Sequence, residues 1–408
     1  MRAGRWQSLV SSLDDPYPAY ERLRSEGPVL RGAPGQWIVT GHPEASAALR
    51  DPRTSVDPSK AQRVNIAPAP AGKLASSRVG QLESEAPRDR LFSLIRLDPP
   101  DHTRLRNHVS KAFTARAVQD YRPFVQDTVD QLLDRAAARG EFDVVEDFGY
   151  ALSVTTIGHL LGVPPDERPM VARWSEHLIR ILNAPGSAAT LVDTERDAIR
   201  QSKDYFTDLI ERRRTSPQDD LMGRLIAMVE QDEITMRELL SLVLLLIAAG
   251  HETVVKLISS GILVLSEHRD QLELLHDDPS LIESAVEEFL RYEPPVQIVI
   301  RFMTEDAQLG GKRITRGSQL AIIVGAANRD PAVFPDPDRV DIRRTDNRHL
   351  SFAGGIHFCL GASLARLEAQ VALATLVARH PHFQAVTGRM ERLENLVLRG
   401  LKHLPVKL

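Results

Sequence analysis

The chain has 408 residues, and its 51 lysines and arginines against 55 aspartates and glutamates give a formal net charge of −4. Hydrophobic residues make up 42%, the usual share in a globular protein, and the near-neutral charge without a long basic run argues against a nucleic-acid binder. The longest apolar stretch, 242–249, is far shorter than the roughly 20 residues of a membrane span, and the N-terminus lacks the apolar core of a secretory signal. We therefore expect a cytoplasmic protein that binds neither nucleic acid nor membrane.

The cysteine count is informative because Cys359 is the only cysteine. It excludes an intrachain disulfide and a cysteine-rich metal site, and it agrees with a reducing compartment.

The first predicted elements are a helix over 17–24, a strand over 35–40 and a helix that begins near Pro43. Regular patterning is lost between about 55 and 100, where the run 67–72 is rich in proline. A loop of this length inside a compact chain is usually functional, and we interpret it as a lid. Helix resumes at 98–101, which carries a capping and first-turn signal, and helical segments continue to about Arg291.

Strand patterns follow at 297–304, near 309 and 314, and at 320–324, whereas 328–350 is irregular. A last helix over 360–379 carries apolar residues at helical spacing, namely Leu360, Leu364, Leu367, Val371 and Ala374. The sequence therefore predicts a mainly helical fold with a minor β component, organised as a single domain over 1–408.

The segment 352–361, which we call the Cys loop, surrounds Cys359 with glycines that allow tight backbone turns. Cys359 directly precedes the last helix, and a helix N-terminus lowers the pKa of a thiol and stabilises the thiolate. This placement suits metal ligation or nucleophilic attack. The alternative is a small buried hydrophobic residue in a turn.

A second motif, 248–253, follows the most apolar helical run and places Glu252 beside Thr253. An acid and a hydroxyl are costly to bury without partners, and together they form a candidate proton relay. The alternative is that Gly250 ends one helix and Glu252 faces solvent.

Three weaker features involve charged side chains that ordinarily lie in solvent. Glu288 and Arg291 are i, i+3 partners on one helix, and His102 and Arg106 are i, i+4 partners. Arg301 stands alone in an apolar strand pattern. Any of the cations can alternatively pair with carboxylates of a ligand.

Taken together, in this order and spacing, the motifs resemble those of soluble bacterial cytochromes P450, a family of haem-thiolate monooxygenases. The Cys loop is similar to the family pattern at Phe352, Gly355, His357, Cys359 and Gly361, with Ala353 where a glycine is usual. Residues 249–253 are similar to the oxygen-activation motif, although Val254 stands where a second hydroxyl is common. Glu288 and Arg291 match the E-x-x-R pair, with Arg339 at the position of the third member of that structural triad.

The resemblance implies the P450 fold, with one haem-containing helical body and small sheets, and haem b held by Cys359 as the iron ligand. The haem propionates would be bound by His102, Arg106, Arg301 and His357, and further haem contacts would come from Ala249, Phe352 and Gly361. Thr253 and Glu252 would deliver protons during oxygen activation. The implied reaction inserts one oxygen atom from O2 into a C–H bond (hydroxylation) or a C=C bond (epoxidation). Glu288, Arg291 and Arg339 would serve folding and haem retention.

Electrons from NAD(P)H would arrive through a ferredoxin and its reductase, since the chain carries no reductase domain, and we expect a monomer. A basic docking face would draw on Arg104, Arg343, Arg344 and Arg366. The family positions of the substrate pocket are mostly apolar, which suits a hydrophobic secondary metabolite such as a polyketide, macrolide or terpenoid. These positions are Leu94, Leu245, Ala249, Val296, Gln297, Val299 and Val397.

Two competing classes remain at this point. One is a thiol hydrolase or transferase that uses Cys359 with His357, although residues two apart in a glycine loop rarely face one substrate together. The other is a haem carrier or sensor without turnover, which we would expect to lack the Glu252–Thr253 pair.

Overall fold

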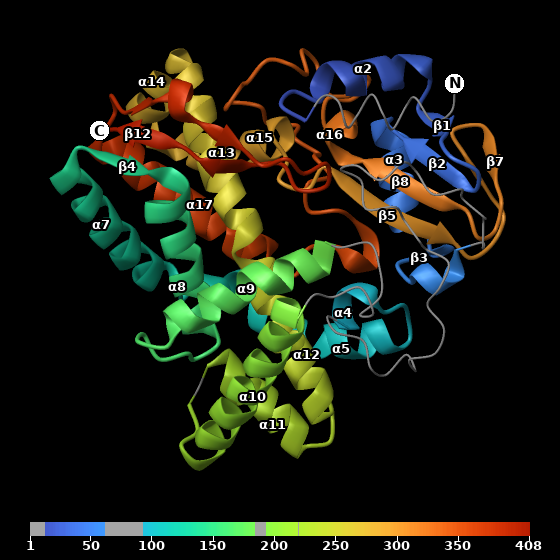
Figure 1. Ribbon diagram of the computed structural model, residues 1–408. Helices are drawn as coiled ribbons and strands as arrows, with labels where there is room; N and C mark the ends of the chain where they lie inside the picture. The colour runs from blue at the N-terminus through green and yellow to red at the C-terminus, as the bar shows by residue number, and fades with distance from the viewer. Residues whose placement is uncertain (1–12, 62–92, 184–192, 219) are drawn as a thin grey trace. The chain divides into compact units, whose positions relative to one another are not determined.

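The computed structural model describes residues 13–61, 93–183, 193–218 and 220–408 (Figure 1). Contacts within the chain divide into two compact units, which we describe separately. The first unit comprises 1–64, 118–152 and 253–408, and the second comprises 65–117 and 153–252. The predicted class, mainly helical with small sheets, is confirmed. The single-domain organisation stays a prediction.

The largest sheet of the first unit has five strands in the order β1-β2-β8-β5-β3. These are β1 (Val29–Arg31), β2 (Gln36–Val39), β8 (Gln319–Ile323), β5 (Ile298–Met303) and β3 (Thr54–Ser55). β2 and β8 are parallel, and the other neighbours are antiparallel. Because side chains alternate along a strand, Ile38 and Ile323 pack with α2 (Tyr17–Glu26) on one face, and Trp37 and Ile322 pack with α3 (His42–Arg50) on the other.

The helices of the first unit surround α17 (Ala362–Arg379), which packs against α7 (Arg122–Arg139), α14 (Arg269–Asp277) and α15 (Ile282–Tyr292). Of the predicted apolar stripe, Leu364, Leu367 and Val371 are buried, whereas Leu360 precedes the helix and Ala374 is half-buried. Helix α13 (Glu252–Glu267) is buried along most of its length.

The shorter elements of the first unit come mostly from pairing between distant segments. Three small sheets pair β4 (Glu141–Asp143), β12 (Pro405–Lys407) and β9 (Gln384–Ala385); β6 (Ala307–Leu309) and β7 (Lys312–Ile314); and β10 (Glu391–Arg392) and β11 (Leu401–His403). The short helical elements are η1 (Pro58–Lys60), the π-helix η4 (Val144–Tyr150), η6 (Pro279–Leu281), α16 (Val324–Ala327), η7 (Gly355–His357) and η8 (Thr387–Arg389). Most of these elements were not predicted.

The second unit is built around α12 (Met236–Gly250), whose residues from Leu242 to Ala248 are all buried. Helix α12 begins with a capping box of Thr235 and Glu238. It packs against α4 (Ser93–Arg96), α9 (Arg168–Asn183), α10 (Asp193–Thr215) and α11 (Leu221–Glu230). The predicted helix start near 98–101 corresponds to α5 (Asp101–Ser110), which η3 (Lys111–Phe113) follows. Helices α6 (Ala115–Gln119) and α8 (Ala151–Leu160) cross the boundary between the units.

Among the described residues, the helical run 236–267 is long and apolar enough to cross a membrane. Its most apolar window is 78% buried inside the protein, so core packing accounts for its composition. Much of the predicted lid, namely 62–92, lies outside the described residues.

Candidate active site

The Cys loop is closed by a hydrogen bond from the Cys359 N–H to the Phe352 carbonyl, at 3.0 Å. Gly355 has φ +66°, and a Cβ there would lie 2.6 Å from the Leu49 carbonyl oxygen, so this turn requires glycine. Ala353, where the family pattern has glycine, also adopts a left-handed conformation with φ +57°. The loop therefore keeps its turn at Ala353 at the energetic cost of a left-handed alanine.

The side chain of Cys359 is exposed on the first unit, so the alternative of a buried cysteine is wrong. Two apolar side chains beside it in sequence are also exposed, Ile356 at 52% and Phe358 at 42%. Apolar side chains that frame an exposed sulfur suit a flat, largely apolar group bound through its metal to the thiolate. These residues therefore fit a haem.

The Glu252–Thr253 motif lies where two helices meet. Helix α12 ends at Gly250, and α13 begins at Glu252. The alternative was thus correct that Gly250 ends a helix. Glu252 does not simply face solvent, because it opens the next helix and is half-buried, as is Thr253. This junction places a carboxyl and a hydroxyl in the first turn of α13.

His251, which the sequence analysis passed over, occupies this junction and is fully buried. Its Nδ1 lies 3.1 Å from the Ile247 carbonyl, and its Nε2 lies 3.3 Å from the Ser175 hydroxyl of α9. Its position between glycine and glutamate gave no signal that its ring would be buried.

The predicted propionate ligands are divided between the units. Arg301 is buried in β5, and His357 is half-buried in η7. In the second unit, His102 and Arg106 lie one turn apart on α5, with His102 buried and Arg106 half-buried. Burial and the neighbouring Arg106 cation lower the pKa of His102 below its ordinary value. Their joint role toward haem stays a prediction.

Three of the predicted pocket residues of the first unit, Val296, Gln297 and Val397, lie where the chain near 296 meets the chain near 398. Val296 forms an isolated antiparallel β-bridge with Leu398, and the Gln297 N–H donates a hydrogen bond to the Val397 carbonyl at 2.8 Å. Val296 and Val299 are half-buried, and Val397 is 36% exposed.

Gln297 differs from expectation because its side chain is 1% exposed and held inside the first unit. Its carbonyl oxygen accepts from the Tyr20 hydroxyl at 2.9 Å, and its amide donates to the Pro294 carbonyl at 2.7 Å. The sequence could not reveal this distant tyrosine. The remaining pocket positions of this unit are therefore valines. In the second unit, Leu94 and Leu245 are buried on the packed elements α4 and α12.

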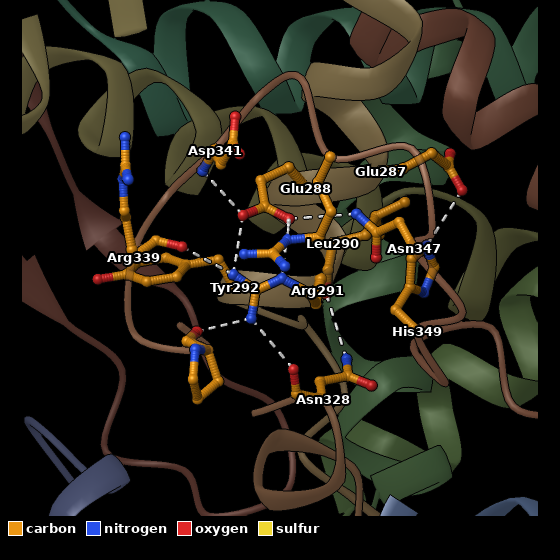
Figure 2. Close-up of polar contacts among 12 residues, drawn as sticks. Glu287, Glu288, Leu290, Arg291, Tyr292, Asn328, Arg339, Asp341, Asn347 and His349 are labelled. Carbon is orange, nitrogen blue, oxygen red and sulfur yellow. Dashed lines mark hydrogen bonds and ion pairs between the residues drawn. The ribbon is translucent and has the colours of Figure 1, made fainter. Parts of the chain in front are cut away.

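Glu288 and Arg291 form a fully buried ion pair on α15, with both nitrogen–oxygen distances at 2.8 Å (Figure 2). Glu288 also accepts from three groups of the irregular segment, namely the Asp341 N–H and the side chains of Arg344 and Asn347. Arg291 donates in turn to three carbonyls, those of Asn328, Pro337 and Arg339. The pair thus fixes a segment that has no regular structure of its own.

The third arginine of this cluster is Arg344 rather than Arg339, which corrects the sequence assignment. The Arg344 Nε lies 3.2 Å from Glu288, whereas Arg339 contributes its backbone carbonyl and has an exposed side chain. Spacing could not distinguish them, because both lie in irregular chain.

The predicted docking arginines are largely engaged within the protein. Arg344 binds Glu288, Arg366 binds Glu287 at 2.6 Å, and Arg104 binds Glu238. Only Arg343 among the four is both exposed and without a carboxylate partner in the described contacts. These intramolecular contacts therefore argue against the predicted docking face.

A family model described as Cytochrome P450 matches residues 76–399. The biotin biosynthesis cytochrome P450 of Bacillus subtilis is 38% identical over 97% of this chain and 96% of its own, and the 6-deoxyerythronolide B hydroxylase of Saccharopolyspora erythraea is 38% identical over 97% and 96%. A crystal structure of P450BioI, in complex with an acyl carrier protein ligated to hexadec-9Z-enoic acid, superposes with a TM-score of 0.85 at 36% identity, covering 98% of this chain and 99% of that one.

Proposed function

The chain belongs to the cytochrome P450 family and is a haem-dependent monooxygenase, and from this premise we propose that it hydroxylates a mainly hydrophobic secondary metabolite with electrons from a ferredoxin and its reductase. The observation that carries the proposal is the exposed Cys359, framed by exposed Ile356 and Phe358. The thiol hydrolase and carrier hypotheses are set aside by the family membership. A cytoplasmic monomer remains part of the proposal.

Cys359 is the proposed ligand of the haem iron, and its thiolate is favoured by the N-terminus of α17, whose N-cap Gly361 is two residues away. When bound, haem supplies reductive activation of O2 and insertion of one oxygen atom into the substrate. His102, Arg106, Arg301 and His357 are proposed to bind the propionates through charge-assisted hydrogen bonds. In this role the ring of His102 donates a hydrogen bond, while the two arginines provide positive charge.

Thr253 and Glu252 are the proposed proton relay. They lie side by side at the start of α13, where the hydroxyl holds a proton and the carboxyl replaces it. Thr253→Ala should lower the product formed per NADPH consumed, because electron consumption continues while proton delivery, which is typically worth about 10²–10⁴-fold in rate, is impaired. Haem content should be unchanged. Thr345→Ala, at an exposed threonine, is the matched control. Unchanged coupling in Thr253→Ala would remove the relay from the proposal.

The substrate class is proposed from the valines at 296, 299 and 397, which offer apolar contact. The Saccharopolyspora relative is named as a hydroxylase of 6-deoxyerythronolide B, which supports a macrolide or another polyketide ahead of a terpenoid. The acyl carrier protein in the P450BioI complex makes a fatty acyl chain the natural competitor.

Spin-state titration separates these classes, because a substrate that enters the pocket displaces water near the iron. We expect a polyketide macrolactone to convert more of the ferric protein to high spin, at lower concentration, than a terpenoid or hexadec-9Z-enoic acid. Conversion by the fatty acid alone would replace the proposed substrate class.

A further inference from the structure

A second carboxylate on α15, Glu287, forms its own cluster beside that of Glu288. The Arg366 Nε and Nη2 donate to its two oxygens at 2.6 and 2.8 Å, which is a bidentate pair. His349 Nε2 donates to the same carboxylate at 3.1 Å, a contact visible in Figure 2. Neither partner belongs to the Glu288 cluster.

The two partners of Glu287 lie on opposite sides of the Cys loop in the sequence. His349 precedes the loop, and Arg366 is in the second turn of α17, after it. One carboxylate therefore holds the chain before Cys359 and the chain after it. Such a tie reduces the freedom of both ends of the loop at once.

Hydrogen bonds hold residues 349–351, directly before the Cys loop, in one arrangement. The Ser351 N–H donates to His349 Nδ1 at 3.2 Å, so Nδ1 is the acceptor and the Nε2–H points at Glu287. The Ser351 hydroxyl donates to the Leu290 carbonyl of α15 at 2.6 Å. Both bonds orient the backbone directly before Phe352.

Arg366, which follows the Cys loop in the sequence, also contacts Phe352. The Arg366 guanidinium lies over the Phe352 ring, with Cζ 4.5 Å from the ring centroid. The Phe352 carbonyl accepts the Cys359 N–H. The guanidinium that Glu287 orients thus packs on the residue that closes the loop.

We propose that Glu287 is a positioning residue for the thiolate ligand, holding the Cys loop in its ligating shape through His349 before the loop and Arg366 with Phe352 after it. The proposal rests on Cys359 as the iron ligand, which is part of the proposed function. It also gives Arg366 a role inside the protein instead of on a docking face.

The test measures the carbon monoxide complex of the reduced holoprotein, without a redox partner. The rate to follow is the conversion from the thiolate-ligated Soret band to the band of the protonated thiol form. Glu287→Gln and Arg366→Gln should each accelerate this conversion by about 5- to 30-fold, the factor for a loss of one or two kcal/mol. Glu283→Gln, at an exposed glutamate one turn earlier on α15, should stay within about twofold of the unmodified protein.

The midpoint potential separates positioning from a general loss of stability. Glu287→Gln removes a negative charge and should raise the potential, whereas Arg366→Gln removes a positive charge and should lower it. The double variant should return toward the original potential and should convert no faster than about the quicker single variant, because both act through one contact. Arg366→Lys, which keeps the charge but loses the bidentate geometry, should accelerate conversion with little change of potential, and it carries the test if Glu287→Gln does not fold.

Conversion rates within twofold of the Glu283→Gln control in both single variants overturn the proposal. So does a weakened ferredoxin affinity of Arg366→Gln with unchanged rate and potential, since Arg366 would then be a docking residue. If the unmodified protein lacks the thiolate band altogether, the ligand assignment of the proposed function fails instead.

Discussion

The Glu288 cluster and the Cys loop belong to the same unit, yet they are opposites in exposure. Glu288 and Arg291 are charged and completely buried, with their partners supplied by irregular chain. Ile356 and Phe358 are apolar and exposed. Removing one partner of a buried charge pair leaves the other charge uncompensated, whereas apolar groups exposed around a reactive sulfur are costly unless they contact a ligand. The difference separates a buried charged cluster within the fold from the exposed residues that we propose to contact the cofactor.

Of all the variants, Glu288→Gln is expected to have the largest effect on the free energy of unfolding. It leaves the Arg291 cation buried without its carboxylate, which should lower the free energy of unfolding by about 3–5 kcal/mol. Urea denaturation followed by circular dichroism measures this loss, and haem content should fall with it. A loss below about 1 kcal/mol would mean that the buried pair is not structural.

The pH dependence of the free energy of unfolding tests how much the ionised Glu287 carboxylate stabilises the fold. Burial raises the pKa of Glu287, but hydrogen bonds from Arg366 and His349 outweigh burial and hold that pKa at about 2, against an ordinary value of 4.5. The ionised carboxylate therefore stabilises the folded chain fully above about pH 4.5, and this contribution is lost as the pH falls toward 2. It amounts to at most about 3 kcal/mol.

Acid denaturation of Glu287→Gln and of the unmodified protein measures this contribution. The two free energies of unfolding should differ most near neutral pH and converge as the pH falls below 4.5. A difference that does not change with pH would contradict the role of the ionised pair.

The corrected triad yields a matched pair of variants. Arg344→Gln should lower the free energy of unfolding by about 1.5–3 kcal/mol, because Glu288 loses a charged donor. Arg339→Gln should change it by less than about 0.5 kcal/mol, because only the Arg339 backbone takes part. Thermal or urea unfolding of both variants decides between the two arginines, and the reverse order would restore Arg339.

The smallest expected effect lies in the Cys loop itself. Ala353→Gly should raise the free energy of unfolding by about 0.5–1 kcal/mol, because glycine adopts the left-handed conformation without the steric cost of a Cβ. Gly355→Ala is the opposite change, since its Cβ would collide with the Leu49 carbonyl, and it should destabilise the protein. A destabilised Ala353→Gly variant would show that the Ala353 methyl makes contacts that outweigh its strain.

Local motifs in the sequence were enough to predict α5, the turn before α17 and the strands β5 and β8, because each depends on neighbouring residues. The sheet of β4, β12 and β9 could not be predicted, since its strands of two or three residues pair across distant parts of the chain. Gln297 and Arg344 were misassigned for the same physical reason. Their partners, Tyr20 and Glu288, are remote in sequence, and only the folded chain brings them together.

The central claim is that Cys359 provides the thiolate ligand of the haem. The most direct measurement is the difference spectrum of the dithionite-reduced protein with and without carbon monoxide, recorded alongside Cys359→Ser. We predict a strongly red-shifted Soret band in the unmodified protein and its absence in the variant. A haem band without that shift in the unmodified protein, or a shift that persists in Cys359→Ser, would contradict the account.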